Sequence, residues 1–261
     1  MIRKIGKYIG NHNLLQLNDK VIVGFSGGAD SVALLHVLAR LNYSCIAAHC
    51  NFHLRGEESD RDEDFAQEEA KKLNIPFYKK DFDTKAYARQ NRQSIEMAAR
   101  ELRYQWFEEL RKDLKAQVIA VAHHQDDSIE TFLLNVIRGT GIRGLTGIRP
   151  KNNAIIRPML AVNRGEIIQW LTKQEIDYQT DSTNLSDEYT RNFIRLRILP
   201  LLKELNPAVS EAILRTSGHL SDLEKLYLTW VEKERTKLID AQKRISIPQL
   251  LKSAAPQSLL Y

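Results

Sequence analysis

Residues 21–31 read Val21-Ile22-Val23-Gly24-Phe25-Ser26-Gly27-Gly28-Ala29-Asp30-Ser31, and this stretch decides the fold. Its first five residues are mostly β-branched or apolar, which is typical of a buried strand. The adjacent glycines then let the chain turn tightly, and an apolar segment of helical period follows over residues 31–41. The stretch therefore predicts a strand, a tight loop and a helix, in that order.

The same alternation recurs downstream. Further strands are expected at residues 45–49, 75–78 and 118–122, and further helices at residues 60–73, 94–111 and 128–138. Repeated βα units with short connections favour the α/β class, with a doubly wound parallel sheet covered by helices on both faces. Ligands of such sheets bind at the carboxyl ends of the strands.

The composition changes after Gly139. Residues 138–149 hold four glycines in twelve residues and are expected to form a loop, whereas Asn163 and Glu166 have capping-box spacing for a short helix that reaches Gln174. From residue 189 the chain reads as mainly helical. We place a boundary near Asn206, between a catalytic domain of residues 1–205 and an appended helical hairpin with a tail in residues 206–261.

Length and composition exclude several classes of protein. The 261 residues, 43% of them hydrophobic, can bury a sizeable core, and two cysteines cannot form a disulfide framework. No apolar run approaches the roughly 18 residues that a membrane span needs, and residues 1–10 do not resemble a signal peptide. We therefore expect a cytoplasmic protein with no membrane partner; the oligomeric state is left open, with a homodimer as one option.

Charge is distributed unevenly. The chain carries 38 Lys and Arg against 33 Asp and Glu, a formal net charge of +5. Residues 57–69 are strongly acidic and are interpreted as a solvated helix face. Residues 138–164 contain bases and no acid, and a second acid-free run contains Arg191, Arg195, Arg197 and Lys203. Runs of this kind favour a phosphate backbone as the partner.

The loop of residues 26–31 carries the most specific chemical signal. Glycines allow the backbone to approach an anion, and the start of the following helix presents free amides and the positive end of its dipole. Asp30 would repel a polyphosphate unless a divalent cation lay between them, which suggests Mg²⁺. The lysine of a Walker motif is absent from the loop, which excludes a P-loop nucleotidase of that type.

This loop resembles the S-G-G-x-D-S loop of the pyrophosphate-loop ATP pyrophosphatases, which bind ATP there and cleave it to AMP and pyrophosphate. Further segments are similar to the branch of that family that joins lysine to tRNA. They are residues 49–55, 99–104, 122–131 with 138–141, and Asp181 and Asn184 followed by residues 191–195. The family continues into further C-terminal domains, so residues 206–261 would begin a truncated tRNA-binding domain.

The resemblance implies a Rossmann-like fold of the adenine-nucleotide alpha-hydrolase type and an ATP-dependent ligase that forms a carbon–nitrogen bond. L-Lysine would be attached to the wobble cytidine of an isoleucine tRNA with a CAU anticodon, through an adenylated cytidine. The product would be lysidine, which changes the tRNA from Met to Ile specificity. ATP and Mg²⁺ would be required.

The resemblance also implies roles for individual residues. ATP would be bound by Ser26, Gly27, Gly28, Ala29, Asp30, Ser31, His49, Asn51 and His53, with Asp30 as the metal ligand. The reaction would involve Asp30, Arg100, Arg103, His123, His124, Asp127 and Glu130. Asp127 and Glu130 would hold the lysine, and Arg191, Asn192 and Arg195 would contact the tRNA.

The residues themselves leave alternatives open. His49 and His53 could form a metal pair, although hydrogen bonding to a nucleotide is favoured, and residues 123–127 could be mistaken for a dinuclear phosphoesterase site. Asp127 and Glu130 could simply favour a helix start, and Arg100 and Arg103 could be solvated. A redox role for the cysteines is not favoured. The general base stays undecided between the carboxylates and the paired histidines.

Rival functions differ in chemistry. A tRNA thiolase of the same superfamily would adenylate a base and deliver sulfur, but the chain has no C-x-x-C pair. Amide-forming synthetases often carry a glutaminase part, and no candidate nucleophile for one is evident. A tRNA-binding module that holds ATP without turnover is the rival from a different class.

Overall fold

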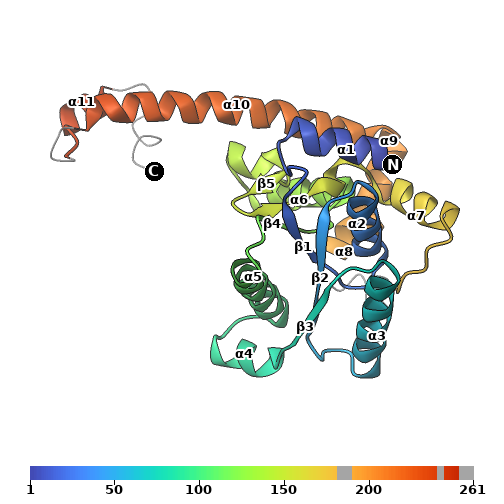
Figure 1. Cartoon of the computed structure of the whole chain (residues 1–261). Helices are drawn as coiled ribbons and strands as arrows, with labels where there is room; N and C mark the ends of the chain where they lie inside the picture. Colours follow the sequence, from blue (N-terminus) through green and yellow to red (C-terminus); the bar gives the residue numbers. More distant parts are fainter. Residues whose placement is uncertain (181–189, 240–243, 253–261) are drawn as a thin grey trace. The chain divides into compact units, whose positions relative to one another are not determined.

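The sheet has the predicted α/β architecture. The computed structural model describes residues 1–180, 190–239 and 244–252. Its six strands lie in the order β3-β2-β1-β4-β6-β5, and all neighbours are parallel except β5 and β6. Figure 1 shows the central strands β1 and β2 side by side. The bounds are β1 Lys20–Gly24, β2 Ser44–Asn51, β3 Phe77–Asp81, β4 Val118–Ala120, β5 Lys151–Asn152 and β6 Ile155–Ile156.

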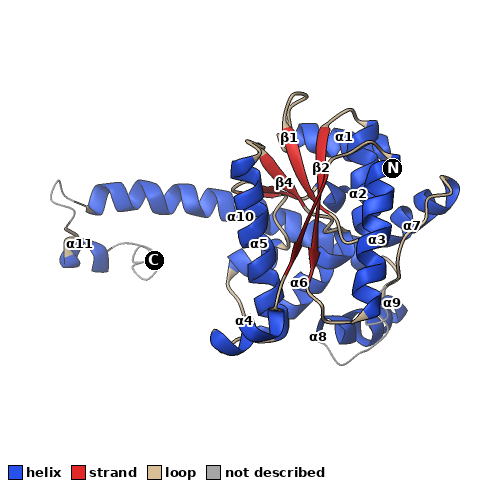
Figure 2. Cartoon of the chain, turned by 60° about the horizontal axis from the view of Figure 1, so that its bottom comes forward, coloured by secondary structure: helices blue, strands red, loops and turns tan. Residues whose placement is uncertain are grey.

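Helices cover both faces of the sheet, as predicted. Successive residues of a strand point to opposite faces of the sheet. Val21 and Val23 of β1 accordingly pack in an apolar cluster on one face, and Ile22 packs in a second cluster on the opposite face. Figure 2 shows α2 and α3 on one side of the strands and α5 on the other. The helices are α1 Ile2–Asn11, α2 Ala29–Arg40, α3 Glu57–Lys72, α4 Thr84–Gln90, α5 Ile95–Asp113, α6 Gln125–Arg138, α7 Arg164–Lys173 and α8 Thr190–Phe193.

Several boundaries differ from the sequence prediction. Strand β3 begins at Phe77 rather than at residue 75, because the Ile75 amide donates to the Ala70 carbonyl and closes the end of α3. Helix α6 begins at Gln125, three residues before the predicted start at Ser128. The capping box of α7 is confirmed, since the Asn163 and Glu166 side chains each bond the other's backbone.

Four short elements were not predicted. Helix α1 is one of them, and its Ile5 and Ile9 are buried in the core. Helix α4, the 3₁₀ turn η2 Pro158–Ala161 and the β5–β6 hairpin are the others, and Asn153 turns the hairpin with a φ of 51°. The hairpin strands have only two residues each, too few for a period to be detected.

The chain forms two compact units. Unit 1 comprises Met1–Ser128 and Ile148–Phe193 and contains the sheet; unit 2 comprises Ile129–Gly147 and Ile194–Tyr261. The glycine-rich loop forms the 3₁₀ turn η1 Ile142–Thr146, and η4 Ile194–Ile198, α9 Leu199–Leu205, α10 Val209–Leu238 and α11 Ile247–Leu251 follow in unit 2. The predicted boundary at Asn206 stays a prediction.

The predicted C-terminal hairpin stays a prediction, and the described residues of this part form two helices of very different length. Helix α10 alone has 30 residues, and α11 has five. Val231 of α10 packs with Leu250 of α11 in a small apolar cluster. No helix among the described residues is long and apolar enough to span a membrane.

Candidate active site

The loop of residues 26–31 lies between the end of β1 and the start of α2. Gly27 has a φ of 84°, a left-handed conformation that glycine adopts without strain. The Ser31 hydroxyl donates to the Gly28 carbonyl at 2.9 Å, and it lies 3.1 Å from the Ser26 hydroxyl. These bonds fix the loop from within. The first backbone amides of α2 can donate hydrogen bonds to an external anion.

Neighbouring elements press closely on the loop. A methyl group at Gly27 would come within 3.3 Å of the Phe65 ring and 3.4 Å of the Asp62 carbonyl. The Gln179 amide donates to the Gly27 carbonyl at 3.0 Å. The tight fit and the positive φ together explain the glycine, and the small loop has the form of an anion cradle.

Asp30 extends from the first turn of α2 toward cationic groups. Its Oδ2 lies 2.9 Å from Nη1 of Arg164, the first residue of α7. The same oxygen lies 3.6 Å from Nε2 of His124, which follows β4. Asp30 therefore connects the loop with two segments that are distant in the sequence.

His124 is a buried cation among three carboxylates. Only 2% of its side chain is exposed, and Asp126 and Asp127 lie 3.3 and 3.5 Å from its ring nitrogens. Burial alone would lower the pKa of His124, but the nearby carboxylates of Asp126, Asp30 and Asp127 outweigh it and raise the pKa to about 10. The imidazole is therefore doubly protonated at neutral pH.

Asp126 and Asp127 also anchor the backbone. Asp127 Oδ2 accepts the His124 amide at 2.9 Å, and Asp126 Oδ2 accepts the Arg164 amide at 2.8 Å. Burial tends to raise the pKa of Asp126, but the nearby His124 cation and the hydrogen bond from the Arg164 amide lower it to about 2. Asp127 thus holds the turn that leads into α6, and Asp126 connects α6 with the start of α7.

His123 has a different environment from its neighbour. It lies half-buried after β4, and Arg157 Nε donates to its Nδ1 at 3.3 Å. Burial lowers the pKa of His123 to about 4; the positive charges of Arg157, Arg100 and Arg191 act in the same direction, while Asp127 opposes them. His123 is consequently neutral where His124 is charged.

Glu130 lies in unit 2 and is bound there by Arg195. Arg195 donates to both oxygens, with distances of 2.6 Å from Nε and 3.2 Å from Nη2, and only 1% of the Glu130 side chain is exposed. Arg191 and Asn192 belong to α8 in unit 1, where Arg191 is exposed. The residues predicted to contact tRNA are therefore split between the two units.

Arg100 and Arg103 lie one turn apart on α5. The Arg100 guanidinium is 5.0 Å from the Tyr104 ring centre, and that of Arg103 is 5.3 Å from the Phe52 ring centre. Phe107 lies further along the same helix, and its ring packs against Gly24, the last residue of β1. A methyl group added at Gly24 would come within 2.9 Å of that ring. Helix α5 is thus seated directly on the strand that leads to the loop.

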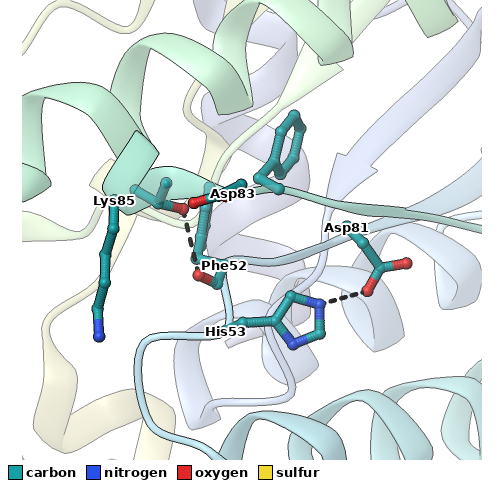
Figure 3. A pocket seen from close by; sticks show the side chains of 7 residues that line it. Phe52, His53, Asp81, Asp83 and Lys85 are labelled. Carbon is teal, nitrogen blue, oxygen red and sulfur yellow. Dashed lines mark hydrogen bonds and ion pairs between the residues drawn. The ribbon is translucent and has the colours of Figure 1, made fainter. Parts of the chain in front are cut away.

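His49, Asn51 and His53 lie where β2 ends, and they face different partners. His49 Nδ1 is 2.9 Å from the Phe25 carbonyl, just before the loop. The buried Asn51 amide donates to Asp60 at 3.2 Å and to Glu63 at 3.1 Å. His53 instead pairs with Asp81 at 2.7 Å, beside a cavity of about 270 Å³ that is also lined by Phe52 and Lys85 (Figure 3).

Metal binding can be tested against these positions. Over residues 1–180, 190–239 and 244–252, no group of three or more His, Cys, Asp and Glu side chains is arranged to hold a metal ion. Mg²⁺ commonly uses one or two carboxylates and completes its shell with substrate phosphates and water. An Asp30 carboxylate beside an anion cradle fits that mode.

Three residues that contact predicted site residues have no predicted role of their own: Arg164, Asp126 and Arg157. Arg164 was noted only as the end of a basic run, and its distance of 134 residues from Asp30 leaves no local signal. Asp126 was part of a recognised segment without a role of its own. Asp181 and Asn184 lie outside the described residues, as do Asp187 and Glu188, acids that could have neutralised the arginines of the second basic run.

The sequence of the chain is similar to those of known proteins. The family described as PP-loop domain matches residues 1–202. A tRNA(Ile)-lysidine synthase of Parabacteroides distasonis is 57% identical over 261 residues, all of this chain and 60% of that protein. One of Petrotoga mobilis is 41% identical over 82% of this chain and 70% of that protein.

Similarity of fold extends further. The chain of a U34-tRNA thiolase from Methanococcus maripaludis, solved with its [4Fe-4S] cluster, superposes with a TM-score of 0.69 at 21% identity and covers 84% of this chain and 77% of that one. The present chain spans about 60% of the length of the Parabacteroides relative. The loop, the sheet and the matched residues together lead to one conclusion: the chain belongs to the PP-loop domain family, in the branch of the tRNA(Ile)-lysidine synthases.

Proposed function

We propose that the chain is the catalytic part of an ATP-dependent ligase that joins L-lysine to the wobble cytidine of a CAU-anticodon isoleucine tRNA. One observation carries the proposal: Asp30, in the first turn after the glycine loop, faces the cluster of His124, Asp126 and Asp127 at the end of the neighbouring strand. The likeness to tRNA(Ile)-lysidine synthases over the full chain supports the substrate assignment.

The loop would bind the triphosphate of ATP. Helix α2 begins at Ala29 after the N-cap Gly28, and the helix dipole favours negative charge at this point. Asp30 would hold Mg²⁺, which would neutralise charge on the departing pyrophosphate. Arg164 and His124, which now offset the Asp30 carboxylate, would keep that side chain oriented toward the loop.

Activation precedes substitution in the proposed reaction. The cytosine oxygen at C2 attacks the α-phosphorus of ATP, a new P–O bond forms, and pyrophosphate leaves. The lysine ε-amine then attacks C2, and the oxygen departs with AMP. Arg100 and Arg103 would stabilise the phosphate charge that builds up as AMP forms.

The lysine amine must lose a proton. Its free pKa of about 10.4 leaves only about one amine in a thousand neutral near pH 7.4. His124 is already protonated, so it is unsuited to accept another proton. Asp127 would therefore hold the ammonium group and accept its proton as the amine attacks C2. We propose the same role for Glu130 once its carboxylate is released from Arg195.

ATP–pyrophosphate exchange tests this function. With purified chain, Mg²⁺ and ATP, exchange should depend on a CAU-anticodon tRNA, and added lysine should convert the adenylated tRNA to lysidine, detected by mass spectrometry of the digested tRNA. ATP binding without exchange would identify a tRNA-binding module. Sulfur transfer would indicate a thiolase, but iron–sulfur clusters of the [4Fe-4S] type need more cysteine ligands than the two in this chain.

A further inference from the structure

His123 and Arg157 meet at the carboxyl edge of the sheet. His123 follows β4 by three residues, and Arg157 directly follows β6. These two strands are parallel neighbours, so their carboxyl ends lie together. Arg157 is a buried charged residue, with 7% of its surface exposed. Burying a guanidinium is costly, which makes its few contacts informative.

The direction of the contact is fixed by chemistry. A guanidinium has only donors, so the hydrogen bond of 3.3 Å from Arg157 Nε must be accepted by a lone pair on His123 Nδ1. A neutral imidazole with a lone pair on Nδ1 carries its proton on Nε2. Arg157 Nη1 also donates to the Arg149 carbonyl at 2.8 Å, which holds the guanidinium plane in position.

The surroundings keep His123 from taking a second proton. Burial is the main cause of its low pKa, and the cations Arg157, Arg100 and Arg191 add to the effect. These positive charges near the carboxyl end of β4 favour an anionic ligand over a cationic one. In such a place an N–H group is useful as a donor to a substrate oxygen.

We propose that Arg157 is a positioning residue that fixes His123 as the neutral tautomer protonated on Nε2, so that His123 donates a hydrogen bond to a phosphate or carbonyl oxygen of the activated cytidine instead of serving as the general base. The inference rests on the proposed function for the identity of the substrate. The tautomer itself does not depend on that function.

Nuclear magnetic resonance of ¹⁵N-histidine-labelled protein reads the tautomer directly. Among the seven histidines, the His123 signals are assigned by their loss in His123→Gln. The wild-type ring should show a protonated Nε2 and an unprotonated Nδ1. In Arg157→Met the ring should become a mixture of tautomers. A proton on Nδ1 in the wild-type protein, or an unchanged tautomer in Arg157→Met, would overturn the proposal.

Two substitutions of His123 distinguish a role as hydrogen-bond donor from a role as general base. The glutamine amide places an N–H near the Nε2 position, whereas the asparagine amide lies near Nδ1, and neither amide can act as a base. His123→Gln should therefore keep much more activity than His123→Asn, by about 100-fold in kcat. Equal and complete loss in both variants would indicate a base and would contradict the proposal.

Arg157 needs a matched control. Arg157→Met should lower kcat by about 100-fold with little change in the KM for ATP, because a wrong tautomer removes an oriented group without removing a binding contact. Arg111→Met removes another arginine that bonds a carbonyl, that of Ala116, at the opposite end of β4, and should leave kcat unchanged. Arg157→Lys keeps a donor for His123 Nδ1, so it should retain the Nε2-protonated tautomer and much more of kcat than Arg157→Met. If Arg157→Met does not fold, the tautomer of the wild-type protein still tests the proposal.

These experiments distinguish a failure of the proposed function from a failure of the positioning role of Arg157. If wild-type protein forms no pyrophosphate with tRNA, the proposed function is wrong, but the resonance spectra still report the tautomer. If wild-type protein is active and the spectra show a proton on Nδ1, the positioning role of Arg157 is wrong while the function stands.

Discussion

Arg195 binds Glu130 through two nitrogen–oxygen contacts, at 2.6 and 3.2 Å, although 65 residues separate them in the sequence. The Arg195 guanidinium therefore occupies the Glu130 carboxylate, which the sequence analysis predicts to bind the lysine substrate. The same arginine was expected to contact tRNA phosphates. One ion pair thus bears on two proposed roles.

Replacement of Arg195 tests which role dominates. Arg195→Ala leaves the Glu130 carboxylate buried without its cation, and should reduce the free energy of unfolding by about 3 kcal/mol. Arg191→Ala, at an exposed position, should leave the melting temperature unchanged and lower the log–log salt slope of tRNA binding by roughly 0.7 to 0.9 units. Melting curves and filter binding at several salt concentrations measure both; the reverse pattern would make Arg195 the tRNA contact.

Asp30→Asn should reduce pyrophosphate release by about 100-fold and leave the fold intact. The amide keeps the shape of the carboxylate but not the charge that a divalent cation requires. Release is measured across a range of Mg²⁺ concentrations, with Asp113→Asn, an exposed acid at the end of α5, as the control. Wild-type release by the Asp30 variant would remove this residue from the mechanism.

Asp127→Asn should raise the KM for lysine about tenfold or more and change the KM for ATP much less. The asparagine oxygen can still accept the His124 amide, so the turn before α6 should survive. Steady-state kinetics with each substrate varied in turn gives the comparison. Equal increases in both constants would mean that Asp127 only supports the backbone.

The His124 cluster makes stability depend on pH. The folded pKa of about 10 lies above the ordinary value of 6.5, so the stabilisation from this histidine is complete below pH 6.5 and disappears as the pH rises through 10. Asp126, with a folded pKa of about 2 against 3.8, contributes above pH 3.8 and loses its contribution as the pH falls toward 2.

The stability advantage of wild type over His124→Gln should therefore be largest between about pH 4 and 6.5 and shrink toward pH 10. Urea unfolding of both proteins at a series of pH values measures it. A difference that stays constant from pH 6.5 to 10 would contradict a charged His124.

Neither cysteine should react as a thiolate in the folded protein. Burial raises the pKa of Cys45 and of Cys50 to about 12, even though Arg103 and Lys80 lower that of Cys50. A thiol reagent at pH 8 should modify both slowly until urea is added. Rapid modification of Cys50 in native protein would restore a redox role to consideration.

The parts of the fold predicted well from sequence were local. The β1 strand, the glycine loop and α2 are adjacent in the chain, so their order and chemistry appear in one stretch of residues. The Asn163 capping box was likewise predicted from a spacing of three. Helix α1 is not predicted from the sequence, because its ten residues bury only Ile5 and Ile9 and are too few to establish a helical period.

Long-range pairs escaped prediction. Nothing near Asp30 indicates Arg164, and nothing near His123 indicates Arg157, because the sheet brings these residues together only after folding. The two histidines are adjacent and chemically identical in sequence, yet one is charged and the other neutral. That difference arises from which carboxylates and arginines surround each ring.

Gly24 determines how closely an entire helix can approach the nucleotide end of the sheet. Even an alanine methyl there would overlap the Phe107 ring, so α5 would have to shift outward. Arg103 and Arg100 lie four and seven residues before that phenylalanine, about 6 and 10 Å along the helix axis. A single methyl group in the strand would thus displace two positive charges that it never touches, while the loop itself stayed whole.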